Sequence, residues 1–408
     1  MKTGLVLSGG GSKGAYEAGC IRALLELGYS FDNVVGTSIG ALNALLVVQE
    51  DYDVLDSLWD DLSIDKVLAT PVNLNISIDS ILKQKNLIKP FFKSYINEKG
   101  ADITPFINLI NGLYKDEKAF SSNMKYGLVT VKFPSLQPLE ITIDDMKHND
   151  PIEYALCSAS CFPAFPIHYK ESQGYIDGGY YDNLPIPLCL NMGSKKIIAI
   201  ELNMEPTHEY LLNKPNITFI RPTWDLQGFL DFTSPLLKWR KALGYLDTMK
   251  VFKKYIGYRY TFEIDSLDKS LARKYYNLVL KNEVSYNNNL ITNKLSTSTS
   301  IITNVLKTNY LDNLDIYDYY IRAVEKVMEK NNYDCDRVYN LNEVTKEIYS
   351  LFVNNENQDI IELATYKMLE SIINNLKENK GISTKKEQIF DDYYEALLYY
   401  LLSKVIKL

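Results

Sequence analysis

The sequence carries a strand-like run that turns directly into a helix-like one: Asn33-Val34-Val35-Gly36-Thr37-Ser38-Ile39-Gly40-Ala41-Leu42. Residues 33–35 are typical of a buried strand, and residues 41–48 are typical of a very apolar helix. Between them, Gly36-Thr37-Ser38-Ile39-Gly40 fits Gly-x-Ser-x-Gly, the pattern of a sharp turn that exposes a serine hydroxyl. Glycines are needed on both sides because a Cβ there would collide with the crossing chain. Ser38 is therefore a candidate nucleophile at a helix N-terminus, where free N–H groups stabilise developing negative charge.

A second junction, one strand–helix unit earlier, is rich in glycine. Residues 4–7 lead into Ser8-Gly9-Gly10-Gly11-Ser12-Lys13-Gly14, and a helical pattern follows over residues 15–27. Consecutive glycines allow backbone N–H groups to converge on an anion without obstruction by side chains. Two interpretations are open: an oxyanion hole completed by the N–H of Ile39, or a phosphate-binding turn.

The second interpretation would make this segment a dinucleotide site. Gly9, Gly11 and Gly14 satisfy Gly-x-Gly-x-x-Gly, and Asp32 lies at about the distance expected of a ribose-binding acid. A Gly-Lys-[Ser/Thr] sequence is missing here, which disfavours a P-loop. A dinucleotide-binding enzyme is thus one alternative function, and a catalytically idle scaffold that binds partners is another.

A third junction ends in an acid, Tyr175-Ile176-Asp177-Gly178-Gly179. Because Asp-Gly is a common turn signal, Asp177 has a structural interpretation as a turn aspartate. The functional interpretation makes it the base that accepts the proton of Ser38, work that a histidine normally does. His208 follows a strand-like run and preserves the order Ser, Asp, His of α/β-hydrolases, so it is the alternative base.

The composition and the hydrophobic patterning of the chain change near residue 255. Before it, short β-like runs alternate with helical patterns, which predicts an α/β layer with a largely parallel central sheet. Beyond it, glycines nearly vanish and apolar residues recur at three- and four-residue spacing, which predicts helices. We expect a domain over residues 1–255 and a mostly α-helical domain of unknown role over residues 256–408, with a loop or linker at 285–293.

Composition limits the other classes of function. The net charge of -7 disfavours nucleic acid as a partner, because phosphate binding relies on basic surface. The five cysteines include no Cys-x-x-Cys, and there are only three histidines, so no metal site is expected. Neither a signal-peptide apolar run nor a stretch of about 20 apolar residues occurs. These features predict a cytoplasmic protein, peripheral to a membrane if it meets one.

Together the three junctions resemble the patatin-like phospholipase family. The resemblance is carried, in this order, by Gly9-Gly10-Gly11-Ser12-Lys13-Gly14, by Gly36-Thr37-Ser38-Ile39-Gly40 and by Asp177-Gly178-Gly179. The segment Ser158-Ala159-Ser160-Cys161-Phe162-Pro163 also looks like a family segment before the strand that leads to the acid. The resemblance covers about residues 1–250, and the second half of the chain adds nothing to it.

The resemblance implies a three-layer α/β/α fold and a Ser–Asp dyad that needs no histidine, metal or cofactor. Ser38 would attack an ester carbonyl of a glycerolipid, and Asp177 would take its proton and later activate water. The oxyanion would be bound by backbone N–H groups from the set Gly9, Gly10, Gly11 and Ile39. Lys13 stands where the family has arginine or lysine, and it would either order the loop or contact a phosphate headgroup. The supporting glycines are Gly14, Gly36, Gly40, Gly178 and Gly179.

Two further segments are candidates for contact with lipid or with another subunit. Residues 78–96 interleave lysines with aliphatic and aromatic residues, which suits an interfacial segment or lid, or else a helix packed on the sheet edge. Residues 389–406 are apolar around most of a helix circumference, which favours core or oligomer packing over membrane docking. We expect a lipid substrate at a membrane or micelle surface and a possible oligomer through the helical domain.

Overall fold

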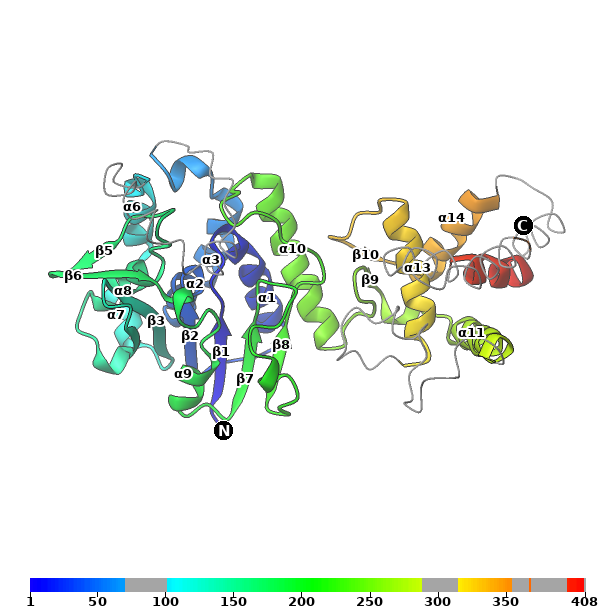
Figure 1. The fold of residues 1–408 in the computed structure, drawn as a ribbon, viewed down its shortest axis with the longest axis horizontal. Coiled ribbons are helices and arrows are strands. Elements are labelled where there is room, and N and C mark those ends of the chain that lie inside the picture. The colour runs from blue at the N-terminus through cyan, green and yellow to red at the C-terminus, as the bar shows by residue number, and fades with distance from the viewer. Residues whose placement is uncertain (70–100, 288–314, 354–366, 368–394, 407–408) are drawn as a thin grey trace. The chain divides into compact units, whose positions relative to one another are not determined.

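The computed structural model describes residues 1–69, 101–287, 315–353, 367 and 395–406. The chain divides into two compact units, Met1–Phe252 and Lys253–Leu408, drawn in Figure 1. We propose that these units are the two domains expected at residues 1–255 and 256–408. The segment 78–96, predicted as interfacial, lies outside the described residues, as do residues 389–394 of the C-terminal run.

In the described part of the first unit, eight strands form one sheet with the order β5-β6-β3-β2-β1-β7-β8, and β4 pairs with β3. The strands are β1 (Thr3–Leu7), β2 (Asn33–Thr37), β3 (Lys125–Phe133), β4 (Pro138–Thr142), β5 (His168–Lys170), β6 (Gln173–Asp177), β7 (Lys196–Ile200) and β8 (Ile217–Ile220). The five strands from β3 to β8 in this order are parallel, whereas β4, β5 and β6 pair antiparallel. The largely parallel central sheet predicted from the sequence is therefore confirmed.

Helices cover both faces of the sheet and give three layers. On one face lie α1 (Gly14–Glu26), α2 (Ile39–Val48), α3 (Tyr52–Asp61), α8 (Asp150–Ser158) and α10 (Ser234–Val251); α6 (Thr104–Leu113) and α7 (Asp116–Ser121) pack outside them. The short α9 (Ile186–Asn191) covers the other face. Successive side chains of a strand point to opposite faces, so Val6 of β1 packs with Leu188 of α9 while its neighbours face the larger helical layer.

The second unit is mostly helical, as predicted. Its described helices are α11 (Lys269–Asn287), α13 (Asp318–Lys330), α14 (Leu341–Val353) and a helix over residues 395–405, with one small sheet of β9 (Thr261–Phe262) and β10 (Val338–Tyr339). The loop predicted at residues 285–293 is wrong for its first three residues, because α11 continues to Asn287. Within the C-terminal run, Leu397, Leu398 and Leu402 are buried, which favours core packing.

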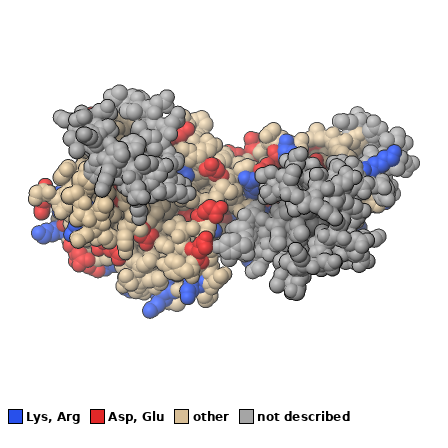
Figure 2. Space-filling model, in the orientation of Figure 1, with Lys and Arg blue, Asp and Glu red and all other residues tan. Residues whose placement is uncertain are grey.

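Three general features of the molecule bear on its environment. The five cysteines are buried and form no disulfide with one another. Among the described residues, every helix is too short or too polar to cross a bilayer. Figure 2 shows acidic side chains spread over the viewed face with basic ones among them, in keeping with the net charge of -7.

Candidate active site

Ser38 lies in a strained turn between β2 and α2. Its backbone angles are φ 56° and ψ −126°, in a region that residues with a Cβ rarely adopt. A Cβ at Gly36 would lie 2.2 Å from the carbonyl oxygen of Gly40, and one at Gly40 would lie 2.6 Å from that of Leu7. Both glycines are therefore required for the chain to pass, for the reason given by the sequence pattern.

Strand register brings Ser38 beside Asp177. Thr37 of β2 pairs with Val129 of β3, and the next residue, Thr130, pairs with Asp177 of β6. The Oγ of Ser38 donates a hydrogen bond of 2.6 Å to Oδ2 of Asp177, although 139 residues separate them. Both residues are buried, with exposed fractions of 6% and 5%. This geometry allows direct proton transfer from the hydroxyl to the carboxylate.

The surrounding backbone orients both members of the pair. The amide of Gly179 donates 2.8 Å to Oδ1 of Asp177, which leaves Oδ2 directed at Ser38. The Oγ of Ser158 accepts a 2.8 Å hydrogen bond from the amide of Ser38 and donates one of 2.6 Å to the carbonyl of Val129. The sequence placed Ser158 in a family segment without giving its hydroxyl a role, and the structure supplies one: it holds the turn.

The segment Gly9–Gly14, called here the glycine loop, lies against the nucleophile. A Cβ at Gly9 would come within 3.0 Å of the Cβ of Ser38, so the loop has room only for glycine there. The amide of Gly9 donates 3.0 Å to the carbonyl of Asn183, so this expected oxyanion donor is already engaged. Within the described part of the chain, the amides of Gly10, Gly11 and Ile39 donate to no protein acceptor. These three remain available to an anion.

The comparisons with known proteins agree with these motifs. The family model described as patatin-like phospholipase matches residues 5–190, which hold Ser38, Asp177 and the glycine loop. Residues 5–190 belong to the patatin-like phospholipase family. The chain is 28% identical over 207 residues to patatin-like phospholipase domain-containing protein 7 of Rattus norvegicus, covering 48% of this chain and 13% of the relative. It is 26% identical over 216 residues to lysophospholipase NTE1 of Mycosarcoma maydis, covering 50% of this chain and 10% of the relative.

The chain thus spans a small part of these curated relatives. Among solved structures, VipD from Legionella pneumophila matches over 100% of this chain and 94% of its own, with a TM-score of 0.41 and 16% identity. The type III effector ExoU matches over 97% of this chain and 77% of its own, with a TM-score of 0.31 and 14% identity. The fold of the first unit is defined by its own strand order and register.

The dinucleotide interpretation is wrong because Asp32 and the glycine loop lie at opposite ends of the parallel strands. Asp32 precedes β2, and its Oδ2 accepts a 2.7 Å hydrogen bond from the amide of Thr3 at the start of β1. The glycine loop follows the carboxyl end of β1 instead. A ribose-binding acid is needed at the carboxyl end of the second strand, where this chain has Ser38.

The three histidines of the chain form their contacts away from the nucleophile. Nε2 of His208 lies 3.1 Å from Oδ1 of Asp182 and 2.9 Å from the carbonyl of Leu184. The imidazole of His148 contacts Asp116, and that of His168 lies 3.1 Å from Glu153. Among the described residues, the base in contact with Ser38 is Asp177, and the alternative of His208 finds no geometric support.

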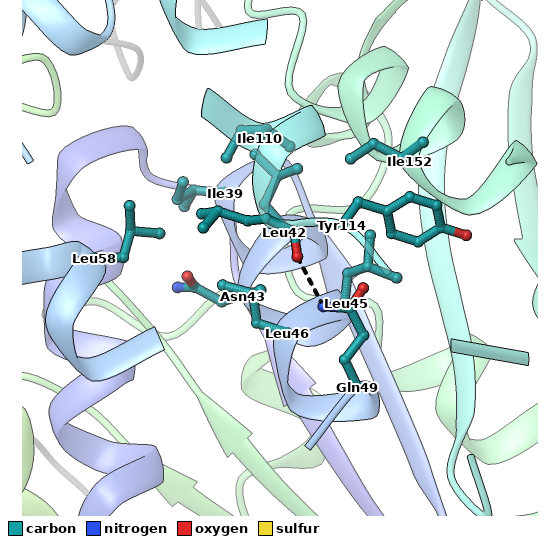
Figure 3. Close-up of a pocket in the computed structure, with 11 residues that line it drawn as sticks. Ile39, Leu42, Asn43, Leu45, Leu46, Gln49, Leu58, Ile110, Tyr114 and Ile152 are labelled. Atoms are coloured by element: carbon teal, nitrogen blue, oxygen red, sulfur yellow. Dashed lines mark hydrogen bonds between the residues drawn. The ribbon is translucent and has the colours of Figure 1, made fainter. Parts of the chain in front are cut away.

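An apolar groove lies along α2, and Figure 3 shows residues that line it. It begins at Ile39, the residue after Ser38, and reaches Gln49 at the other end of the helix, a length of about 15 Å. The lining residues are Ile39, Leu42, Asn43, Leu45, Leu46 and Gln49 with Leu58, Ile110, Leu113, Tyr114 and Ile152.

Lys13 is half-buried at the last turn of the 3-10 helix Gly11–Lys13. Its two expected roles, ordering the loop and contacting a phosphate headgroup, stay predictions.

Burial sets the protonation of the acid. Removal from water raises the pKa of Asp177 to about 6, and the hydrogen bonds from Ser38 and Gly179 oppose that rise. Desolvation disfavours the charged carboxylate, while donors stabilise it. The carboxylate is still the main form at neutral pH, and it is a stronger base than an exposed aspartate.

For ester hydrolysis by Ser38 with Asp177 as its base, the pH profile of kcat/KM should report this carboxyl group. We expect kcat/KM to fall about tenfold per pH unit below about pH 6, because protonated Asp177 cannot accept the proton of Ser38, and to level off above it. The measurement is kcat/KM for a soluble short-chain ester between about pH 4.5 and 8, with the folded fraction checked at each pH. A profile that stays flat to the acid limit would exclude Asp177 as the titrating base.

Proposed function

We propose that this chain is a serine lipid acyl hydrolase of the phospholipase A or lysophospholipase type, with Ser38 as nucleophile and Asp177 as general base. The observation that carries the proposal is the 2.6 Å hydrogen bond from Ser38 to Asp177 at a strained turn, beside a loop of unengaged amides. The reaction needs no cofactor. The substrate is a carboxylic ester of a glycerolipid, met at a membrane or micelle surface.

Acylation begins when Oγ of Ser38 attacks the ester carbonyl and its proton passes to Oδ2 of Asp177. The negative charge that develops on the carbonyl oxygen is bound by the N–H groups of Gly10, Gly11 and Ile39. Collapse of the tetrahedral intermediate breaks the C–O bond, and the leaving alcohol takes the proton from Asp177. Each well-placed oxyanion donor contributes about 10²–10³ in rate, so most of the acceleration lies in the glycine loop.

Deacylation reuses the same groups in the reverse order. Water attacks the acyl-Ser38 ester while Asp177 accepts one of its protons, and the second oxyanion forms at the same amides. When that intermediate collapses, Oγ of Ser38 leaves and recovers the proton from Asp177, which releases a fatty acid. The helix dipole of α2 adds favourable potential at both steps because the oxyanion forms at its N-terminus.

The apolar groove supports a substrate with a hydrocarbon tail. Its few polar side chains are already engaged: Oδ1 of Asn43 accepts 3.1 Å from the indole N–H of Trp59, and the amide of Gln49 donates to the carbonyl of Leu113. The hydroxyl of Tyr114 donates 2.6 Å to Asp116. What is left to a ligand is aliphatic surface that starts one residue from the nucleophile, which suits the acyl chain of the ester.

Blocking the far end of this groove should shorten the preferred acyl chain. Leu113 lies half-buried in the wall near Gln49, so Leu113→Trp adds bulk at this end of the groove. We expect kcat/KM for a palmitate ester to fall about tenfold or more, since each buried methylene contributes about 0.8 kcal/mol, while the butyrate ester changes less than about twofold.

The matched control is Leu109→Trp. Leu109 lies one turn earlier in α6, is also half-buried and does not line the groove. Equal changes in both variants, or a palmitate-to-butyrate ratio in Leu113→Trp like that of the unaltered chain, would contradict acyl-chain binding in the groove.

The proposed function as a whole is tested on a mixed phospholipid extract. Release of fatty acids and lysolipids that requires Ser38 would support it, and the identities of the products give the ester position. Transfer of acyl groups to an added alcohol would instead indicate an acyltransferase. If the folded chain releases no product and a fluorophosphonate probe labels no serine, the chain is a scaffold and the proposal fails.

A further inference from the structure

A buried arginine of α10, Arg240, forms a hydrogen bond with the glycine loop. Arg240 has no exposed surface, and one of its terminal nitrogens donates 2.8 Å to Oγ of Ser12, 228 residues away in the sequence. Its remaining hydrogen bonds reach backbone carbonyls of the segment that precedes α10, called here the clamp loop, residues 226–231. These bonds go to Leu226 at 2.8 Å, Gly228 at 2.7 Å and Asp231 at 3.0 Å.

The clamp loop contacts the glycine loop directly as well. The amide of Ser12 donates 2.6 Å to the carbonyl of Phe229, and its hydroxyl donates to the carbonyl of Gly228 at 3.3 Å. Gly11 has φ of +57°, and a Cβ there would lie 2.4 Å from the same carbonyl of Phe229. The backbone of one loop is thus seated on the backbone of the other, at the edge of the sheet where β1 and β8 end.

The cost of burying Arg240 points to a role beyond packing. Within the described part of the chain, its hydrogen-bond acceptors are carbonyl oxygens and one hydroxyl, and the charges of Asp231 and Asp225 favour the guanidinium without a direct ion pair. Burial lowers the pKa of Arg240 to about 10, so the guanidinium stays charged at neutral pH. A buried charge without a carboxylate in direct contact is unfavourable compared with an apolar side chain of the same size.

We propose that Arg240 is a positioning residue for the oxyanion hole, acting through Ser12 and the clamp loop to keep the amides of Gly10 and Gly11 turned toward Ser38. This inference rests on the function proposed above. Glycines adopt either sign of φ at little cost, so the glycines themselves do little to hold their peptide groups in one orientation. The contacts at Ser12 fix the peptide between Gly11 and Ser12, and the amide of Lys13 fixes the carbonyl of Gly10 at 3.2 Å.

The sequence offers a matched pair of serines to test this. Ser8 and Ser12 flank the three glycines and are both buried, with exposed fractions of 1% and 0%. The hydroxyl of Ser12 bonds to Arg240, whereas that of Ser8 has no hydrogen-bond partner among the described residues. Alanine at either position removes one buried hydroxyl, but only at Ser12 does it release the clamp.

We expect Ser12→Ala to lower kcat for a soluble ester by about 10–100-fold with KM changed less than about twofold, because a misdirected amide weakens binding of the transition state more than that of the substrate. Labelling of Ser38 by a fluorophosphonate should slow by a similar factor, since it also forms an oxyanion-like adduct. Ser8→Ala should keep both rates within about twofold.

A purely structural role for Arg240 predicts a lower melting temperature in Ser12→Ala with an unchanged kcat well below it, and that result would overturn the proposal. Equal losses in Ser8→Ala and Ser12→Ala would overturn it too. Should Ser12→Ala fail to fold, Ser12→Cys weakens the same hydrogen bonds at nearly the same size, with Ser8→Cys as its control. If the unaltered chain shows no Ser38-dependent hydrolysis or labelling, the proposed function fails and this inference with it.

Discussion

Ser38→Ala is expected to lower kcat for ester hydrolysis by about 10⁴–10⁶-fold, because alanine has no hydroxyl to form the covalent intermediate at the oxyanion hole. The strained turn, the 2.6 Å bond to Asp177 and the unengaged amides all converge on this one oxygen atom. The measurement is product release from a soluble ester and from phospholipid vesicles, with fluorophosphonate labelling as a second readout.

The control for this prediction is Ser8→Ala, a buried serine near the same loop whose hydroxyl has no partner among the described residues. It should retain labelling and turnover. If Ser38→Ala still incorporates the probe, or hydrolyses the ester at more than about one hundredth of the original rate, the nucleophile lies elsewhere and the dyad is wrong.

The parts of the site that follow from local sterics could be predicted from the sequence. Gly36 and Gly40 are needed because a Cβ at either would collide with backbone two or more residues away. The five-residue pattern Gly-x-Ser-x-Gly is enough to predict that requirement. The parallel strands are likewise encoded in short β-branched runs bounded by glycine. Asp177 is a candidate because it ends a short strand before two glycines, and the register of β2, β3 and β6 brings it to Ser38.

The parts that depend on contacts between distant segments could not be predicted. Gly9 belongs to the same glycine run as Gly10, yet its amide is bound by the carbonyl of Asn183, which no motif in the sequence announces. Arg240 lies in an ordinary helical pattern, and only the folded chain joins it to Ser12. The position of Asp32 depends on a strand boundary. Asp32 comes just before β2, so it lies at the amino end of the parallel strands, whereas a residue just after β2 lies at their carboxyl end.

Asp177→Asn is expected to lower kcat by about 10²–10⁴-fold, the usual contribution of a general base. Asparagine can still accept from the amide of Gly179 through its oxygen and can donate to Oγ of Ser38 through its nitrogen, so the geometry of the turn should survive. What is lost is the ability to take a proton. The acid limb near pH 6 should disappear from the residual activity together with the carboxylate.

The control variant is His208→Gln. It removes the imidazole that the chain order of α/β-hydrolases would favour as the base, while glutamine can still bond to Asp182. Because His208 lies against Asp182 and Leu184, turnover should stay within about twofold. A loss above about 10³-fold in His208→Gln, with Asp177→Asn active, would restore a histidine-dependent mechanism.

Stability should change in the opposite direction to activity in Asp177→Asn. The folded chain raises the pKa of Asp177 to about 6, so between about pH 4 and 6 the unfolded chain releases a proton that the folded chain still holds. The free energy of unfolding therefore falls as the pH rises through this window, and the deficit persists above it. Asparagine has no charge to desolvate, and at pH 7 we expect the variant to be more stable by about 1–3 kcal/mol. Below about pH 4 this gain should vanish, because Asp177 is then protonated in both states.

Denaturant unfolding of the unaltered chain and of Asp177→Asn, at pH 7 and below about pH 4, measures the difference in the free energy of unfolding. An inactive variant that is also less stable at pH 7 would mean that the substitution broke the turn, whereas an inactive and more stable one separates the catalytic charge from the fold.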